Sequence, residues 1–134
     1  MGFTSSAEVA KYMGGIFEAA FADPEIGPKL EATGLVVAFD FTDPEAALLI
    51  DMANKTVQEG LDGGPPPMAT MSMSAETGNA YWQGKVNLPL AMAKKQIKVD
   101  GNVASLLKLA PLSKRLYPLY VERLKADGRD DLLA

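Results

Sequence analysis

The stretch "KKQIKVDGNVASLLKL", residues 94–109, contains the end of one periodic pattern and the start of another. Apolar and polar residues alternate up to Asp100, as in a strand with one buried face, and Gly101 permits a tight turn. Asn102 is a favourable helix cap, and from Val103 the apolar residues recur at helical spacing. The stretch therefore predicts a strand that turns sharply into a helix. The apolar face expected for this helix comprises Val103, Leu106, Leu107, Leu109 and Ala110.

The residues before this corner predict two helices and then a series of strands. Apolar residues at three- and four-residue steps predict a helix over residues 5–22, which Ser5 or Ser6 can cap. A second helix is expected over residues 25–32, with Gly34 at its end. Beyond Gly34 the apolar period changes to two, which is typical of half-buried strands. Four strands are expected within residues 35–42, 46–54, 55–61 and 68–74.

Helical patterns return on both sides of the corner. Residues 75–86 predict a helix, and residues 87–93 predict one more helical turn before the last strand. After the corner, Pro111 is expected to interrupt the helix, because proline lacks a backbone N–H and clashes with the preceding turn. A separate last helix is then expected over residues 113–126.

The order of these elements predicts an α+β fold. Consecutive strands with short connections favour a five-stranded, mostly antiparallel sheet, covered on one face by helices. No segment has the length of an interdomain linker, so a single domain over residues 1–134 is expected. It would comprise N-terminal helices (5–33), a sheet and helix core (34–110) and a C-terminal helical tail (111–134).

The composition narrows the classes of function. The 134 residues include no cysteine and no histidine. Disulfides, thiolate nucleophiles, Ser-His-Asp triads and most zinc sites are therefore excluded, and we expect neither a cofactor nor a metal. The sequence shows no signal-peptide pattern and no apolar run as long as a membrane span, which predicts a soluble, cytoplasmic protein.

Charged residues are distributed unevenly along the chain. Residues 1–84 contain three Lys or Arg and twelve Asp or Glu, whereas residues 85–125 contain nine basic and two acidic residues. Such asymmetry favours an acidic partner, such as membrane phosphates or a CoA group. No nucleic-acid-binding motif accompanies the charge, so nucleic acid is not expected. The alternative is that the two halves neutralise each other in the folded protein.

Three segments together resemble the sterol carrier protein two domain, or sterol-transfer, family. They are "MATMSMSAETGNAYWQGKVN" (68–87), "QIKVDGN" (96–102) and "VASLLKL" (103–109). The resemblance implies a five-stranded sheet whose helices enclose an apolar tunnel. It also implies binding of fatty acids, fatty acyl-CoA, sterols or phospholipids, with no chemical step.

The resemblance and the apolar pattern together give a set of candidate ligand-binding residues. Lys85 is the candidate for contact with a lipid head group, although a lysine at a helix end also simply complements the helix dipole. The methionines adapt to varied apolar shapes, and ordinary core filling is the alternative for them and for Trp82. The candidates for the tunnel lining are Phe39, Met71, Met73, Tyr81, Trp82, Leu88, Met92, Ile97, Val99, Val103, Leu106 and Leu107.

Lipid binding and transfer without catalysis is the function that this sequence favours, with transient contact with a membrane surface. The alternative is an interaction module with a filled cavity, which forms a homodimer or accompanies a lipid-metabolising enzyme. An enzyme would need Asp40 or Asp51 beside Tyr81 as a proton acceptor in an apolar pocket. Both aspartates lie on the polar phase of their strands, so we expect both to be exposed.

Overall fold

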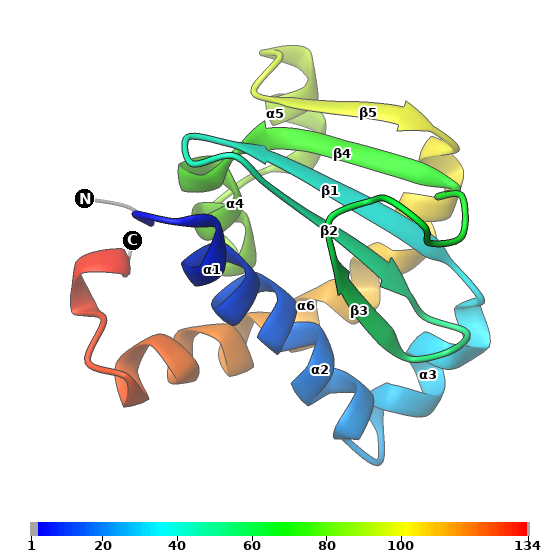
Figure 1. Cartoon of the computed structure of the whole chain (residues 1–134), viewed down its shortest axis with the longest axis horizontal. Coiled ribbons are helices and arrows are strands. Elements are labelled where there is room, and N and C mark those ends of the chain that lie inside the picture. The colour runs from blue at the N-terminus through cyan, green and yellow to red at the C-terminus, as the bar shows by residue number, and fades with distance from the viewer. Residues whose placement is uncertain (1–2, 134) are drawn as a thin grey trace.

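Helices occupy both ends of the chain, and strands occupy its middle (Figure 1). The computed structural model describes residues 3–133, except the side chain of Lys108. The first helical segment is continuous and includes a π-helical turn. Its N-cap is Ser5, whose hydroxyl accepts a hydrogen bond from the Glu8 backbone N–H at 3.2 Å. The N-terminal helices are α1 (Ser6–Val9), the π turn η1 (Ala10–Gly14), α2 (Gly15–Ala22) and α3 (Ile26–Thr33).

Five strands form one mixed sheet, which confirms the predicted α+β class and the mostly antiparallel sheet. The strands are β1 (Val36–Thr42), β2 (Ala46–Asp51), β3 (Thr56–Glu59), β4 (Ala69–Ser74) and β5 (Ile97–Gly101). Their order is β3-β2-β1-β4-β5, and β1 and β4 are the parallel pair. This pairing arises because the chain after β3 crosses to the far side of β1 instead of adding a strand beside β3.

The two faces of the sheet differ in what covers them. On the helix-covered face, Phe39 pairs with Leu48 of β2 and with Met71 of β4, and all three side chains are buried. Figure 1 shows α6 (Val103–Ala126) passing behind the sheet on this side. The opposite face carries polar residues, among them the exposed Asp40 and Lys98, which pair with Ser72 of β4 from either side. The core therefore lies between one face of the sheet and the helices.

The predicted break at Pro111 was wrong, because α6 continues through both Pro111 and Pro118 for 24 residues. Both prolines are exposed, so each removes a backbone hydrogen bond on the side of the helix that faces water. The opposite side packs a continuous stripe onto the core, which stabilises the helix against that loss. In Figure 1 the helix curves along its path, as prolines permit. The stripe comprises Leu106, Leu109, Ser113, Leu116, Tyr120 and Leu124.

The strand-to-helix corner forms as the sequence predicts. The Asn102 side chain accepts a hydrogen bond from the Ser105 backbone N–H at 3.2 Å and so caps α6. Gly101 has φ of 97°, and a Cβ there would lie 2.5 Å from the Met68 carbonyl oxygen, so the position requires glycine. The apolar face predicted after it was wrong in part, because Leu107 is 58% exposed.

The remaining elements are α4 (Ala75–Trp82), α5 (Leu88–Ala93) and the 3-10 turn η2 (Asp130–Leu132). The two ends of the described chain lie on the same side of the molecule (Figure 1). There the Arg129 guanidinium donates to the Glu8 carboxylate at 2.6 Å. A hydrogen bond from the Thr4 backbone N–H is the largest cause that lowers the pKa of Glu8 to about 2, and the hydrogen bond from Arg129 is the next largest. No helix among residues 3–133 is both long and apolar enough to cross a bilayer.

Candidate functional site

Trp82, on the last turn of α4, is the centre of an aromatic cluster in the core. Its ring lies edge-on to Phe17 of α2 at 5.2 Å and to its neighbour Tyr81 at 5.1 Å, measured between ring centroids. Phe39 of β1 lies 6.0 Å away, and Tyr117 of α6 lies 6.4 Å away. These edge and tilted contacts are the preferred arrangements of aromatic rings. Three helices and the sheet therefore meet at a single buried indole.

Methionines extend this cluster along the sheet. Met71 pairs in register with Phe39 and Val99, and Met73 pairs with Phe41 and Ile97. Both methionines are buried, and unbranched thioether side chains adapt readily to the shape of their neighbours. The side of the sheet that faces α4 and α6 is therefore apolar and carries two flexible side chains.

The structure brings most of the candidate ligand-binding residues together and leaves a few apart. Seven of them belong to one buried cluster: Phe39, Met71, Met73, Tyr81, Trp82, Ile97 and Leu106. Leu88 and Val99 pack against that cluster while partly exposed, and Met92 is also partly exposed. Val103 and Leu107 are 38% and 58% exposed, and Lys85 is exposed beyond the end of α4. In this structure protein side chains fill the centre of the predicted lining.

Three residues at this centre escaped the sequence-based prediction: Phe17, Ser113 and Tyr117. Phe17 lies on the apolar face predicted for the first helix, but periodicity does not show which strand that face meets. The Tyr81 hydroxyl hydrogen-bonds with Ser113 and Tyr117, which places a polar group inside the apolar cluster. Burial raises the pKa of Tyr81 to about 12 and also raises that of Tyr117, so both hydroxyls stay protonated at neutral pH.

The two aspartates considered for catalysis occupy different environments. Asp40 is exposed on the open face of the sheet, as expected. Asp51 is 6% exposed, so its predicted exposure was wrong. Its carboxylate accepts hydrogen bonds from the backbone and side-chain N–H groups of Asn54 at 3.1 and 2.8 Å, because the chain folds back after β2. Within residues 3–133, no cluster of three or more acidic side chains could hold a metal ion.

Comparisons with known proteins agree with this architecture. The model of the SCP-2 sterol transfer family matches residues 16–114. The chain is 26% identical to the sterol carrier protein domain 2 of Helicoverpa armigera, over 87% of this chain and 96% of that one, with a TM-score of 0.69. A comparison with curated proteins finds no match.

Two further solved structures share the fold at lower identity. Sterol carrier protein 2 of Aedes aegypti, in complex with palmitate, is 22% identical over 83% of this chain and 96% of that one, with a TM-score of 0.56. A sec-alkylsulfatase from Pseudomonas is 18% identical over 66% of this chain but only 14% of its own, with a TM-score of 0.53. Together with the family match, the fold and the buried cluster lead to one conclusion: the chain belongs to the SCP-2 sterol transfer family.

Proposed function

We propose that this protein binds a long-chain lipid between the sheet and helices α4 and α6, and releases it to an acceptor. The observation that carries the proposal is the buried, methionine-containing apolar cluster around Trp82, Met71 and Met73, in a chain of the SCP-2 family. The related Aedes aegypti protein was solved in complex with palmitate, so a fatty acid is the first ligand to test. Fatty acyl-CoA and sterol-like ligands belong to the same proposal.

Binding requires the side chains of the cluster to move, because they fill the proposed site in the free protein. Methionine has three rotatable bonds and no branch, so Met71 and Met73 can turn aside at modest cost. Burying about fifteen methylenes provides roughly 12 kcal/mol, at about 0.8 kcal/mol each. Association and reordering consume several kcal/mol or more of that gain. The remainder corresponds to binding of micromolar order, which permits both loading and release.

The proposed lining keeps the candidates from the sequence and adds residues at the centre of the cluster. The buried hydroxyls of Tyr81 and Ser113 offer hydrogen bonds to a polar group of the ligand. Lys85 is exposed and is proposed to meet the larger head group of an acyl-CoA or phospholipid outside the cluster. The proposed lining comprises Phe17, Phe39, Met71, Met73, Tyr81, Trp82, Leu88, Met92, Ile97, Val99, Leu106 and Tyr117, with Val103 and Leu107 at its outer edge.

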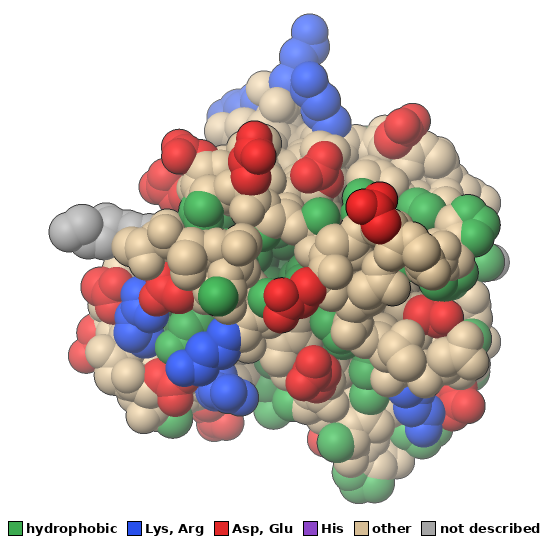
Figure 2. All heavy atoms as spheres, viewed as in Figure 1, with side chains coloured by type: hydrophobic (Ala, Val, Ile, Leu, Met, Phe, Trp, Pro, Cys, Tyr) green, Lys and Arg blue, Asp and Glu red, His purple; other side chains and the backbone are tan. Residues whose placement is uncertain are grey.

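A basic and apolar tip supports transient contact with a membrane surface. Figure 2 shows Lys or Arg side chains projecting at the top of the molecule, over the turn that joins α5 to β5. Lys94, Lys95 and Lys98 are exposed there, and Leu90 of α5 is 51% exposed. Lysines near a bilayer surface are attracted to anionic lipids, and an exposed leucine can enter the head-group region. This tip is the proposed docking point for lipid transfer.

The alternative is an interaction module whose core stays filled. The close packing around Trp82 favours it, and the same fold occurs within a larger sec-alkylsulfatase. Such a module would form a homodimer or accompany a lipid-metabolising enzyme, and it would bind no lipid of its own.

Native mass spectrometry of the protein as purified separates the two functions. The carrier predicts co-purified lipid, or binding of added palmitate in a one-to-one complex after lipid extraction. A ligand-free dimer that also ignores added palmitate would support the interaction module. Ligand extraction in organic solvent then identifies the class of lipid.

A further inference from the structure

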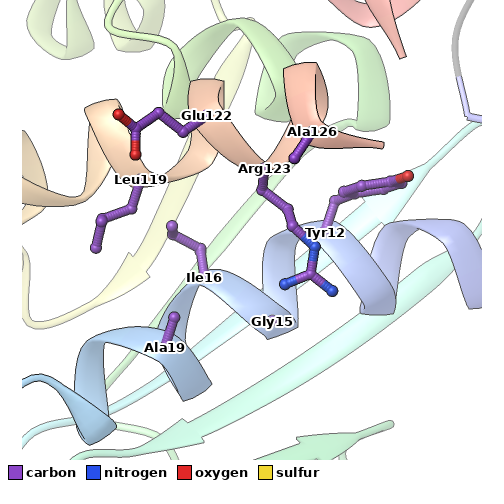
Figure 3. Close-up of a pocket in the computed structure, with 8 residues that line it drawn as sticks. All are labelled: Tyr12, Gly15, Ile16, Ala19, Leu119, Glu122, Arg123 and Ala126. Carbon is purple, nitrogen blue, oxygen red and sulfur yellow. The ribbon is translucent and has the colours of Figure 1, made fainter. Parts of the chain in front are cut away.

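A hollow of about 270 Å³ opens between the first helical segment and the C-terminal half of α6, and we call it the entry crevice. Figure 3 shows Tyr12, Gly15, Ile16 and Ala19 facing Leu119 and Ala126 across it. Its lining is mostly apolar. Gly15 and Ala19 keep it open, because a Cβ at Gly15 would meet no atom within 4 Å. The volume of the hollow is close to the lower limit for small-molecule pockets, and it suits part of an alkyl chain.

The floor of the entry crevice is also the outer wall of the core. Tyr12 and Ile16 line the crevice, yet they are only 3% and 4% exposed and belong to the buried cluster. Phe17 follows Ile16 directly and lies against Trp82 at 5.2 Å and Phe39 at 5.8 Å. The crevice therefore adjoins the proposed lipid site, because one turn of the helix contributes to both.

Two features favour a local opening of the contact between the two helices that border the crevice. Gly15 and Ala19 offer α6 few side-chain atoms, so little apolar contact is lost at these two positions when the crevice widens. On the other side, Pro118 lacks a backbone N–H and cannot make the usual helical hydrogen bond. Helices bend preferentially at such positions. The contact between α2 and α6 at the crevice therefore combines small side chains with a helix that can bend.

One cation extends toward the mouth of the crevice. In Figure 3 the Arg123 guanidinium points toward Gly15, whereas the Glu122 carboxylate points away from α2. Arg123 and Lys11 both lie 3.5 Å from the same carboxylate oxygen of Asp127. These ion pairs are largely exposed, and such pairs contribute little stability. A ligand carboxylate can therefore replace Asp127 as the partner of Arg123.

We propose that a straight-chain fatty acid enters the protein through the entry crevice with its methyl end first, and that its carboxylate stops beside Arg123. This inference rests on the proposed function, because it names the route and the ligand class of the same site. Arg123 lines both the crevice and an adjoining surface hollow, which also carries Lys11, Glu18 and Glu59. Glu18 and Glu59 repel a carboxylate, so the head group is expected on the crevice side of Arg123.

The route is tested by filling the crevice with Gly15→Leu and Ala19→Leu, alone and together. The backbone at Gly15 is helical (φ −61°), so leucine is compatible with it. Stopped-flow fluorescence of Trp82 measures the association and dissociation rates of palmitate. We expect both rates to fall roughly tenfold, as for a blocked gate, with a much smaller change in Kd because entry and exit share the route. The exposed Ala22→Leu, outside the crevice on the same helix, is the matched control and should not change either rate.

Three results would overturn the route. Unchanged rates in folded Gly15→Leu and Ala19→Leu variants would place entry elsewhere. A weaker Kd that arises from faster dissociation at an unchanged association rate would make the crevice a part of the final site instead of its entrance. No binding of palmitate by the unmodified protein would reject the proposed function itself, and the inference with it.

The head-group position is tested with palmitate and hexadecanol side by side. Arg123→Gln should weaken the binding of palmitate severalfold and leave the affinity for hexadecanol unchanged, since only the acid carries a charge. Asp127→Asn should strengthen the binding of palmitate, because it frees Arg123 and Lys11 from their shared carboxylate. Equal effects on both ligands, or none on either, would contradict a carboxylate beside Arg123.

Discussion

Met71→Ala distinguishes a lipid carrier from an interaction module with a filled core. The two functions predict different effects of added palmitate on the stability of this variant. The Met71 side chain is 2% exposed and lies between Phe39 and Val99 in the register of the sheet. Removing the atoms beyond its Cβ leaves a cavity in the core, which costs about 2–5 kcal/mol. For a domain of this size the melting temperature falls by about 3–5 °C for each kcal/mol. Both readings predict this loss in the absence of ligand.

The two proposed functions predict different stabilities once palmitate is added. At a concentration of one hundred times Kd, a ligand of the folded state stabilises by about 2.7 kcal/mol. If palmitate lies against position 71, the cavity accommodates about two methylenes, a further gain of roughly 1.6 kcal/mol. The melting temperature of Met71→Ala should therefore rise more with palmitate than that of the unmodified protein.

Met52→Ala is the matched control for this experiment. Met52 is 0% exposed, and its sulfur lies 3.6 Å from the Thr33 hydroxyl, away from the proposed lining. The variant should lose similar stability, and palmitate should restore no more of it than in the unmodified protein. Equal recovery in the two variants, measured by thermal melts followed by circular dichroism, would refute the placement of the ligand against Met71.

Three further predictions concern the helix cap, the basic tip and the contact between the two ends of the chain. Asn102→Ala should cost about 1 kcal/mol in urea unfolding through loss of the cap, and an unchanged midpoint would show that the cap contributes nothing. Changing Lys94, Lys95 and Lys98 together to glutamate should slow transfer to anionic vesicles, with the difference shrinking in high salt; identical rates at low salt would reject docking through this tip. The pKa of Glu8 is about 2 in the folded protein, below its ordinary value of 4.5, so its contribution is present above pH 4.5 and is lost as the pH falls toward 2. Glu8→Gln should therefore destabilise the protein at pH 7 and match the unmodified protein near pH 2, whereas a constant difference across this range would contradict the assigned pKa.

The parts of the fold that could be predicted from sequence depend on local backbone chemistry. Ser5 and Asn102 cap helices where the sequence places caps, because each side chain bonds to an N–H within its own first turn. Gly34 ends α3 with φ of 63°, a conformation that glycine adopts without strain. The alternation of Val37, Phe39 and other apolar residues predicts the buried face of β1 correctly. These signals need no knowledge of distant residues.

The features that the sequence did not predict depend on contacts between distant residues. Pro111 and Pro118 lie inside α6 because the opposite side of that helix is buried against the sheet and α2, which local helix rules do not include. Leu107 has the spacing of a core residue, but it is 58% exposed, outside the stripe of α6 that packs on the core. Asp51 is on the polar phase of β2, yet its partner Asn54 folds back over it.

The candidate site shows the same division. Periodicity and the family resemblance together identify Met71, Met73 and Trp82, which the structure brings into one cluster. Phe17 and Tyr117 join them from the two ends of the chain, and only the packing of α2 and α6 against α4 reveals those contacts. The parallel pairing of β1 with β4 likewise joins segments that no local signal links.

The fluorescence of Trp82 tests the central claim most directly, since Trp82 is the only tryptophan in the sequence and lies at the middle of the proposed site. Lipid-extracted protein is titrated with palmitate, and the emission spectrum is recorded at each step. A lipid that enters between the sheet and α4 changes the surroundings of this buried indole, so we predict a saturable change in emission with a midpoint of roughly micromolar order. A folded, ligand-free protein whose Trp82 emission stays constant with fatty acids, acyl-CoAs, sterols and phospholipids would contradict lipid binding and favour the interaction module.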